Sequence, residues 1–69
     1  MTIHIPIGAT VIVHRAGQMD QRYIMRGGMP PQFEDEHGNI CERSPLDEGF
    51  HSLTVTDPAT GQRTFYQPR

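Results

Sequence analysis

Large apolar residues are so few in this chain that they can form only one thin hydrophobic core over one sheet. The chain has 69 residues, of which 35% are hydrophobic, and it contains no Trp. Because ordering a chain of this length costs nearly as much free energy as its apolar burial returns, we expect one small domain of modest stability spanning residues 1–69, as a monomer or weak homodimer. The candidate core residues are Ile3, Ile5, Ile7, Val11, Ile12, Val13, Tyr23, Ile24, Met25, Phe33, Ile40, Leu46, Phe50, Leu53, Val55, Phe65 and Tyr66.

Three strands are predicted in the first part of the chain. Thr2–Ile7 alternates, with its three Ile residues on one face, although Pro6 confines this strand to a sheet edge or ends it. Thr10–His14 is a continuous apolar run, which is typical of a strand buried on both sides or at the centre of a sheet. Residues 16–20 form a loop of hairpin length, after which Gln21–Arg26 returns as the third strand.

A further hairpin is predicted over residues 32–43, after the Gly and Pro residues at 27–31 break the chain. The pair Gly38–Asn39 supplies turn residues that tolerate positive φ, and Phe33 and Ile40 flank it as apolar positions. A short helix starting at the prolines is the alternative, because the segment before the turn has no β-branched residue. The hairpin is the preferred interpretation.

Residues 44–49 carry the clearest helix-start signal, with Ser as N-cap, Pro at the first helical position, an acid at the third and a final Gly. They predict one short helical turn near 45–48. Residues 51–56 and 62–67 are typical of strands joined by a turn at 57–61. The expected fold class is therefore mainly β, a small antiparallel sheet or partly open barrel of about five to seven short strands in hairpins.

No motif predicts catalysis, secretion or a membrane span. Ser44 and Ser52 lack the surroundings of a nucleophile elbow, and the glycines at 27 and 28 lack the Lys and Ser or Thr of a phosphate-binding loop. The single Cys excludes an internal disulfide, and the N-terminal residues lack the basic stretch of a signal peptide. We expect a cytoplasmic protein that is not an enzyme and needs no cofactor or membrane.

The formal net charge of −2 conceals an uneven distribution. Between residues 34 and 48, six carboxylates oppose one Arg, a local net of −5, whereas the remainder has five Arg against two Asp, a net of +3. Such a segment predicts a surface that steers the protein to a basic groove, displacing nucleic acid where the groove normally holds it. The same charges also suit a solvated loop that keeps a small domain soluble. The candidate partner-binding residues are Glu34, Asp35, Glu36, Glu42, Asp47 and Glu48.

Arg15, Arg22 and Arg26 support an alternative function, a small β-rich module that binds single-stranded nucleic acid through charge and aromatic stacking. Two features oppose it. The acidic segment would repel such a ligand, and Tyr23 points to the strand face opposite Arg22 and Arg26, together with Met25. Nucleic acid is therefore the less favoured partner.

His37, Cys41 and His51 are the candidates for a metal-stabilised fold. The spacing of His37 and Cys41 across a turn would bring two ligands together. Structural zinc favours four Cys or His ligands in recognised pairs, and this chain has one Cys. We therefore predict no metal, and expect Cys41 to be a small buried apolar residue.

The segment F-E-D-E-H-G-N-I-C-E-R-S-P-L-D-E, within one tiny domain that lacks a catalytic motif, resembles small phage-encoded inhibitors of host defence, in particular anti-CRISPR proteins. The likeness lies in the general character of the chain rather than in a shared motif, so no binding residue is carried over from it. It implies a stoichiometric inhibitor that docks on a nucleic-acid-handling complex such as a CRISPR effector, in the host bacterial cytosol. Some members of this group imitate DNA with carboxylates.

Overall fold

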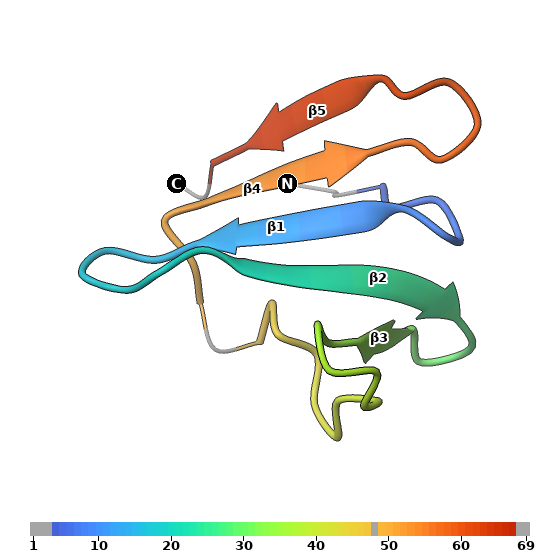
Figure 1. Cartoon of the computed structure of the whole chain (residues 1–69), viewed down its shortest axis with the longest axis horizontal. Coiled ribbons are helices and arrows are strands. Elements are labelled where there is room, and N and C mark those ends of the chain that lie inside the picture. The colour runs from blue at the N-terminus through green and yellow to red at the C-terminus, as the bar shows by residue number, and fades with distance from the viewer. Residues whose placement is uncertain (1–3, 48, 68–69) are drawn as a thin grey trace.

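One antiparallel sheet of five strands forms the domain in the computed structural model, which describes residues 4–47 and 49–67. The strands are β1 (Thr10–His14), β2 (Gln21–Gly27), β3 (Gln32–Glu34), β4 (Ser52–Thr56) and β5 (Arg63–Tyr66). Their order is β3-β2-β1-β4-β5, so β1 is central and the outer strands are β3 and β5 (Figure 1). The predicted mainly β fold is confirmed, as an open sheet rather than a closed barrel. Within the described ranges, no helix has the length and apolarity to cross a membrane.

Two of the three hairpin connections follow predicted turns, whereas the predicted break at residues 27–31 is itself a hairpin connection between β2 and β3. β1 and β2 pair around residues 16–20, and residues 27–31 form the turn and the bulged strand end between β2 and β3. β4 and β5 are joined by residues 57–61, where the Asp57 carboxylate accepts the N–H of Ala59 at 2.7 Å and Gly61 has a φ of 74°. The connection from β3 to β4 is the long one, and it returns the chain to the free side of β1.

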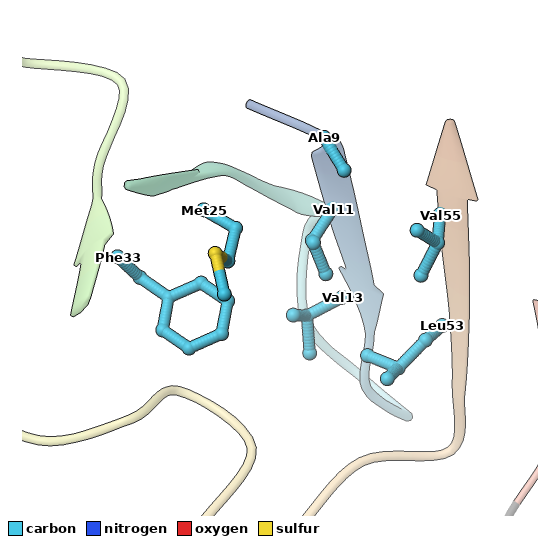
Figure 2. Close-up of a cluster of buried hydrophobic side chains, with 7 residues drawn as sticks. All are labelled: Ala9, Val11, Val13, Met25, Phe33, Leu53 and Val55. Carbon is cyan, nitrogen blue, oxygen red and sulfur yellow. The ribbon is translucent and has the colours of Figure 1, made fainter. Parts of the chain in front are cut away.

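The hydrophobic core lies on one face of the sheet. Val11, Val13 and Leu53 have no exposed surface, since side chains alternate along a strand and these three point the same way. The whole cluster consists of Ala9, Val11, Val13, Met25, Phe33, Leu53 and Val55 (Figure 2). Loop residues cover it, and those packed against the cluster include Ile5, Cys41, Leu46 and Phe50.

The prediction of a strand at Thr2–Ile7 is wrong for residues 4–7, while residues 2 and 3 lie outside the described ranges. Pro6 has no N–H, and its carbonyl accepts the N–H of Ala9 at 3.1 Å in a turn. Gly8, with a φ of 88°, donates to the carbonyl of Met25 at 2.7 Å. The predicted shared face is lost with the strand, because residue 5 packs on the core whereas residue 7 is 71% exposed.

The hairpin predicted over residues 32–43 is confirmed, and the helical alternative is wrong. Asp35 donates its N–H to the carbonyl of Asn39 at 2.9 Å, and Gly38 between them has a φ of 83°. The returning side pairs through a single bridge from Glu34 to Ile40. Ile40 is consequently 48% exposed rather than buried.

The helical turn predicted near 45–48 is not formed at residues 45–47, which make hydrogen-bonded turns, and residue 48 lies outside the described residues. The Ser44 hydroxyl accepts the N–H of Leu46 at 3.3 Å, as a cap would, but the Pro45 carbonyl accepts from the guanidinium of Arg15 at 2.7 Å. In a helix that carbonyl would take the N–H of Gly49, which instead donates to Leu46 at 3.3 Å. The segment is therefore bonded to the distant end of β1, a contact that local helix propensity does not include.

Candidate functional site

The face of the sheet opposite the core is here called the open face. Strand alternation sends every second side chain to it, and the cross-strand registers align these side chains in rows. One long row consists of Arg22, Ile12, Thr54 and Phe65. The other consists of Glu34, Ile24, Thr10, Thr56 and Arg63. None of the partly buried apolar residues that pack on the core belongs to either row. The described loops thus cover one face and leave the other available.

The open face carries three large apolar side chains, with Ile12 on the central strand β1, Ile24 on β2 and Phe65 on the outer strand β5. Phe65 is 60% exposed, and Ile12 and Ile24 are half-buried between their strand neighbours. All three are among the residues that the sequence predicts for the core. Their exposure does not follow from the sequence, because an alternating strand does not reveal which of its faces the loops will cover. One sequence signal for the exposure of Phe65 was its spacing of two residues from Arg63, which places both side chains on the same strand face.

Hydrogen bonds fix the orientation of His14 at one end of the open face. Its Nδ1 lies 2.8 Å from a carboxylate oxygen of Asp20, and its Nε2 lies 3.1 Å from the hydroxyl of Thr54. The ring centroid is 6.4 Å from that of Phe65. The order hydroxyl, imidazole, carboxylate is that of hydrolase triads, but such sites also need donors for an oxyanion. Thr54 lies inside β4 between two paired strands, so its backbone N–H is committed to the sheet.

Carboxylates of the acidic hairpin, defined as residues 34–39, lie along the β3 side of the open face. Both oxygens of Glu34 accept from Nη2 of Arg26 at 3.1 Å, and Nε of Arg26 adds a third contact at 3.3 Å. Glu36 is exposed and accepts the backbone N–H of Arg22 at 3.2 Å. This part of the predicted acidic surface is therefore anchored to β2.

Asp35 holds the hairpin turn together. One of its oxygens accepts the backbone N–H groups of His37 at 2.9 Å and Asn39 at 3.0 Å. These bonds, above all the one from Asn39, hold the pKa of Asp35 below its ordinary value, although burial opposes them. The Asp35 carboxylate thus has a structural role in the hairpin turn.

We expect acidification to weaken the acidic hairpin through Asp35. A carboxyl whose pKa is lower in the folded than in the unfolded chain stabilises the fold above the unfolded pKa, about 3.9 for Asp, and loses this contribution as the pH falls through the folded pKa. An NMR titration of the Asp35 carboxyl should have a lower midpoint than the same group in a peptide of residues 33–41. Asp35→Asn, which keeps an acceptor oxygen, should remove this pH dependence. Equal midpoints in protein and peptide would contradict the assignment.

The remaining predicted acidic residues lie elsewhere. Glu42 and Asp47 are exposed and line a cavity of about 850 Å³ beside Cys41, whereas residues 34–36 line a different hollow with Arg22. Glu48 lies outside the described residues. The structure therefore divides the sequence cluster into two separate groups.

Arg15, Arg22 and Arg26 do not form a single basic surface. Arg15 lies at the end of β1 and donates to the carbonyls of Pro45 at 2.7 Å and Gly49 at 3.0 Å. Arg22 and Arg26 share the open face, as predicted from strand alternation. Tyr23 packs on the core side, which confirms its predicted position opposite these two arginines.

Cys41 and the candidate metal ligands form no centre. Among the described residues, no three His, Cys, Asp or Glu side chains gather as a metal site, so His37, Cys41 and His51 are not brought together. Burial raises the pKa of the Cys41 thiol, and the charge of Asp35 raises it further. A raised pKa favours the neutral thiol, which is the unreactive form.

Comparison with known protein families, curated proteins and solved structures returns no match to this chain. The open face and the acidic hairpin beside it combine an exposed aromatic side chain with charged groups of both signs. Aromatic residues and Arg, which β5 carries side by side on this face as Phe65 and Arg63, are enriched in protein interfaces. These features define the candidate functional site.

Proposed function

We propose that this chain is a non-enzymatic interaction protein that binds a basic partner protein through its open face and acidic hairpin. The observation that carries the proposal is that the described residues pack a core on one face of the sheet and leave Phe65 60% exposed on the other. Leaving an aromatic ring in water forgoes the free energy of its burial, which a partner would recover. Phe65, on the outer strand β5, is the exposed aromatic contact of the proposed interface.

The size of the face suits one partner. The molecule extends 27 × 26 Å in the two larger directions, and a standard protein interface takes about 800 Å² from each side. The open face with the hairpin along one edge can supply most of such an area. Half-buried Ile12 and Ile24 would form its apolar centre, with the charged groups at the rim.

The charges around the open face favour a protein over a polyanion. Three arginines, Arg22, Arg26 and Arg63, are balanced by the carboxylates of Asp20, Glu34 and Glu36. Of these carboxylates, Glu36 is exposed on a hairpin whose turn is fixed by hydrogen bonds, so it is suited to steer a basic partner. A groove that normally holds nucleic acid, as in the CRISPR effectors implied by the anti-CRISPR resemblance, is the partner surface that we propose. Occupying it would exclude the nucleic acid.

One observation keeps nucleic-acid binding as a second candidate. Arg22 and Phe65 lie in the same cross-strand row, which would combine a cation with a stacking surface for a single strand. Against it, Arg26 is neutralised by the two-oxygen contact with Glu34. Arg15 is engaged by the loop at residues 45–49.

Capture of partners from a bacterial lysate that contains phage-defence complexes tests the proposal. Immobilised wild type and a Thr60→Ala control, altered in the exposed turn at 57–61, should retain the same protein. Phe65→Ser should weaken its binding about thirty-fold, since truncation of an aromatic anchor residue costs about 2 kcal/mol. Glu36→Arg should slow association and reduce its salt dependence. Equal retention by all four proteins would refute the proposed surface.

Titration of fluorescent single-stranded DNA at low salt separates the two candidates. The proposal expects no binding at micromolar protein, whereas the second candidate expects binding that Arg22→Glu abolishes. Binding that Arg22→Glu abolishes would contradict the proposed protein partner and support nucleic acid as the ligand.

A further inference from the structure

The two edges of the sheet differ in whether another segment of the described chain covers them. At the β3 edge, the returning hairpin closes the strand through the bridge from Glu34 to Ile40 and through the N–H of Cys41, which donates to the carbonyl of Phe33 at 2.8 Å. At the other edge, no described segment lies beyond β5 (Figure 1). Residues 63–65 of β5 are all exposed. An uncovered edge presents unpaired backbone donors and acceptors that another strand can take up.

The outward backbone groups of β5 can be assigned from its pairing with β4. Asp57 donates its N–H to the carbonyl of Gln62 at 2.8 Å, so these two residues are a hydrogen-bonded pair next to the hairpin turn. Because hydrogen-bonded and non-bonded pairs alternate along an antiparallel ladder, Thr64 also directs its backbone groups to β4. The N–H and C=O groups of Arg63 and Phe65 therefore point away from the sheet.

We propose that β5 pairs antiparallel with β5 of a second copy of this chain, with Thr64 facing Thr64 at the twofold axis. In this register Arg63 of each copy lies opposite Phe65 of the other. Both residues have outward backbone groups, so two hydrogen-bonded pairs form across the axis. Both also have their side chains on the open face, so the pleats of the two strands match. The result is one continuous sheet built from two domains.

Side-chain chemistry favours this register over its neighbours. The guanidinium of Arg63 would lie beside the ring of Phe65 from the other copy, a cation–π contact made twice. Shifting the strands in one direction sets Arg63 against Arg63, which is repulsive. Shifting the strands in the opposite direction sets Phe65 against Phe65. In that register Arg63 would have to pair with residue 67, which lies beyond the end of β5. The proposed register is satisfied within β5 alone.

This inference concerns the edge of the sheet and does not depend on the proposed function. The proposed pairing and the proposed function both involve Phe65, so the test uses Thr64 instead. The side chain of Thr64 is exposed and points to the face opposite Phe65. A Cys at the axis would meet its own copy in a non-hydrogen-bonded pair, with Cα atoms about 4.5 Å apart, which lies within the range that a disulfide spans.

The experiment compares disulfide formation at two positions in a Cys41→Ser background. Thr64→Cys should form a covalent dimer under mild oxidation about tenfold faster than Thr60→Cys, a control in the exposed turn. Equal rates at the two positions would overturn the proposal. Faster dimerisation of Phe65→Cys than of Thr64→Cys would overturn the register.

Sedimentation of the protein without engineered cysteines supplies the second readout. Wild type should be dimeric at millimolar concentration, and Arg63→Pro monomeric, because proline removes one outward N–H while the bonds from β5 to β4 remain. Thr64→Lys, which sets two ammonium groups against each other at the axis, should also be monomeric. A wild type that stays monomeric up to millimolar concentration would refute the proposal.

Discussion

Replacing Leu53 with Ala is expected to lower the free energy of unfolding by about 3–5 kcal/mol. Leu53 has no exposed surface and lies in β4, opposite Val13 on one side and Tyr66 on the other. The truncation leaves a cavity that a thin core covered by loops cannot refill with neighbouring side chains. Since a domain of 69 residues has roughly 3–10 kcal/mol of total stability, the variant should be largely unfolded or close to it.

Urea denaturation followed by circular dichroism measures this effect, because the chain has no Trp to report fluorescence. Met19→Ala is the control, since Met19 is 89% exposed in the loop between β1 and β2 and its truncation should change stability by less than about 0.5 kcal/mol. A similar loss of stability in both variants would mean that the core is not organised around β4.

The strands that sequence analysis located correctly are those whose signals are local. Thr10–His14 and Gln21–Gly27 alternate or carry β-branched residues on both sides of a loop of hairpin length. The hairpin of β4 and β5 has Asp57 and Gly61 at the turn positions that those residue types favour. Neighbouring residues supply each of these signals, so no knowledge of the remaining chain was needed.

The errors arose where a distant residue decided the outcome. The helix signal at residues 44–49 is local, whereas the turns observed at residues 45–47 contact the distant Arg15 through the carbonyl of Pro45. The strand expected at the N-terminus gave way to a turn that is bonded to Met25 of β2. Neither contact follows from local propensity, which measures preferences within a segment only.

The candidate site was harder to predict than the fold for the same reason. Clustering in sequence suggested one acidic surface, but the hairpin fold anchors residues 34–36 to β2 and leaves Glu42 and Asp47 at a separate cavity. Whether Ile12 and Phe65 are buried depends on which face the long connection from β3 to β4 covers. Strand alternation alone makes both faces equally suitable.

Replacing Arg15 with Ala is the second substitution from which we expect a large effect, a loss of about 2–3 kcal/mol in the free energy of unfolding. Arg15 is half-buried and bonds to two carbonyls of the loop at residues 45–49, besides the side chain of Gln21. Hydrogen bonds to a charged group contribute about 1.5–3 kcal/mol each, and removing the donor leaves the carbonyl of buried Pro45 without it. Leu46 belongs to this loop and packs against the core, so its packing would be weakened.

Arg22→Ala and Arg63→Ala are the matched controls, because both arginines are exposed on the open face and should each change stability by less than about 0.5 kcal/mol. Hydrogen exchange adds a local readout. The amides of Asp47 and Gly49, which donate to Ser44 and Leu46, should exchange faster in Arg15→Ala than in either control. Arg15→Lys should recover only part of the stability, since an ammonium group cannot reproduce the fork of a guanidinium across two carbonyls. Equal stability of the three alanine variants would show that Arg15 does not stabilise the fold. Arg15 would then again be a candidate for binding nucleic acid. The expected ranking instead makes Arg15 the residue that fixes the loop over the core, and so determines which face of the sheet stays open.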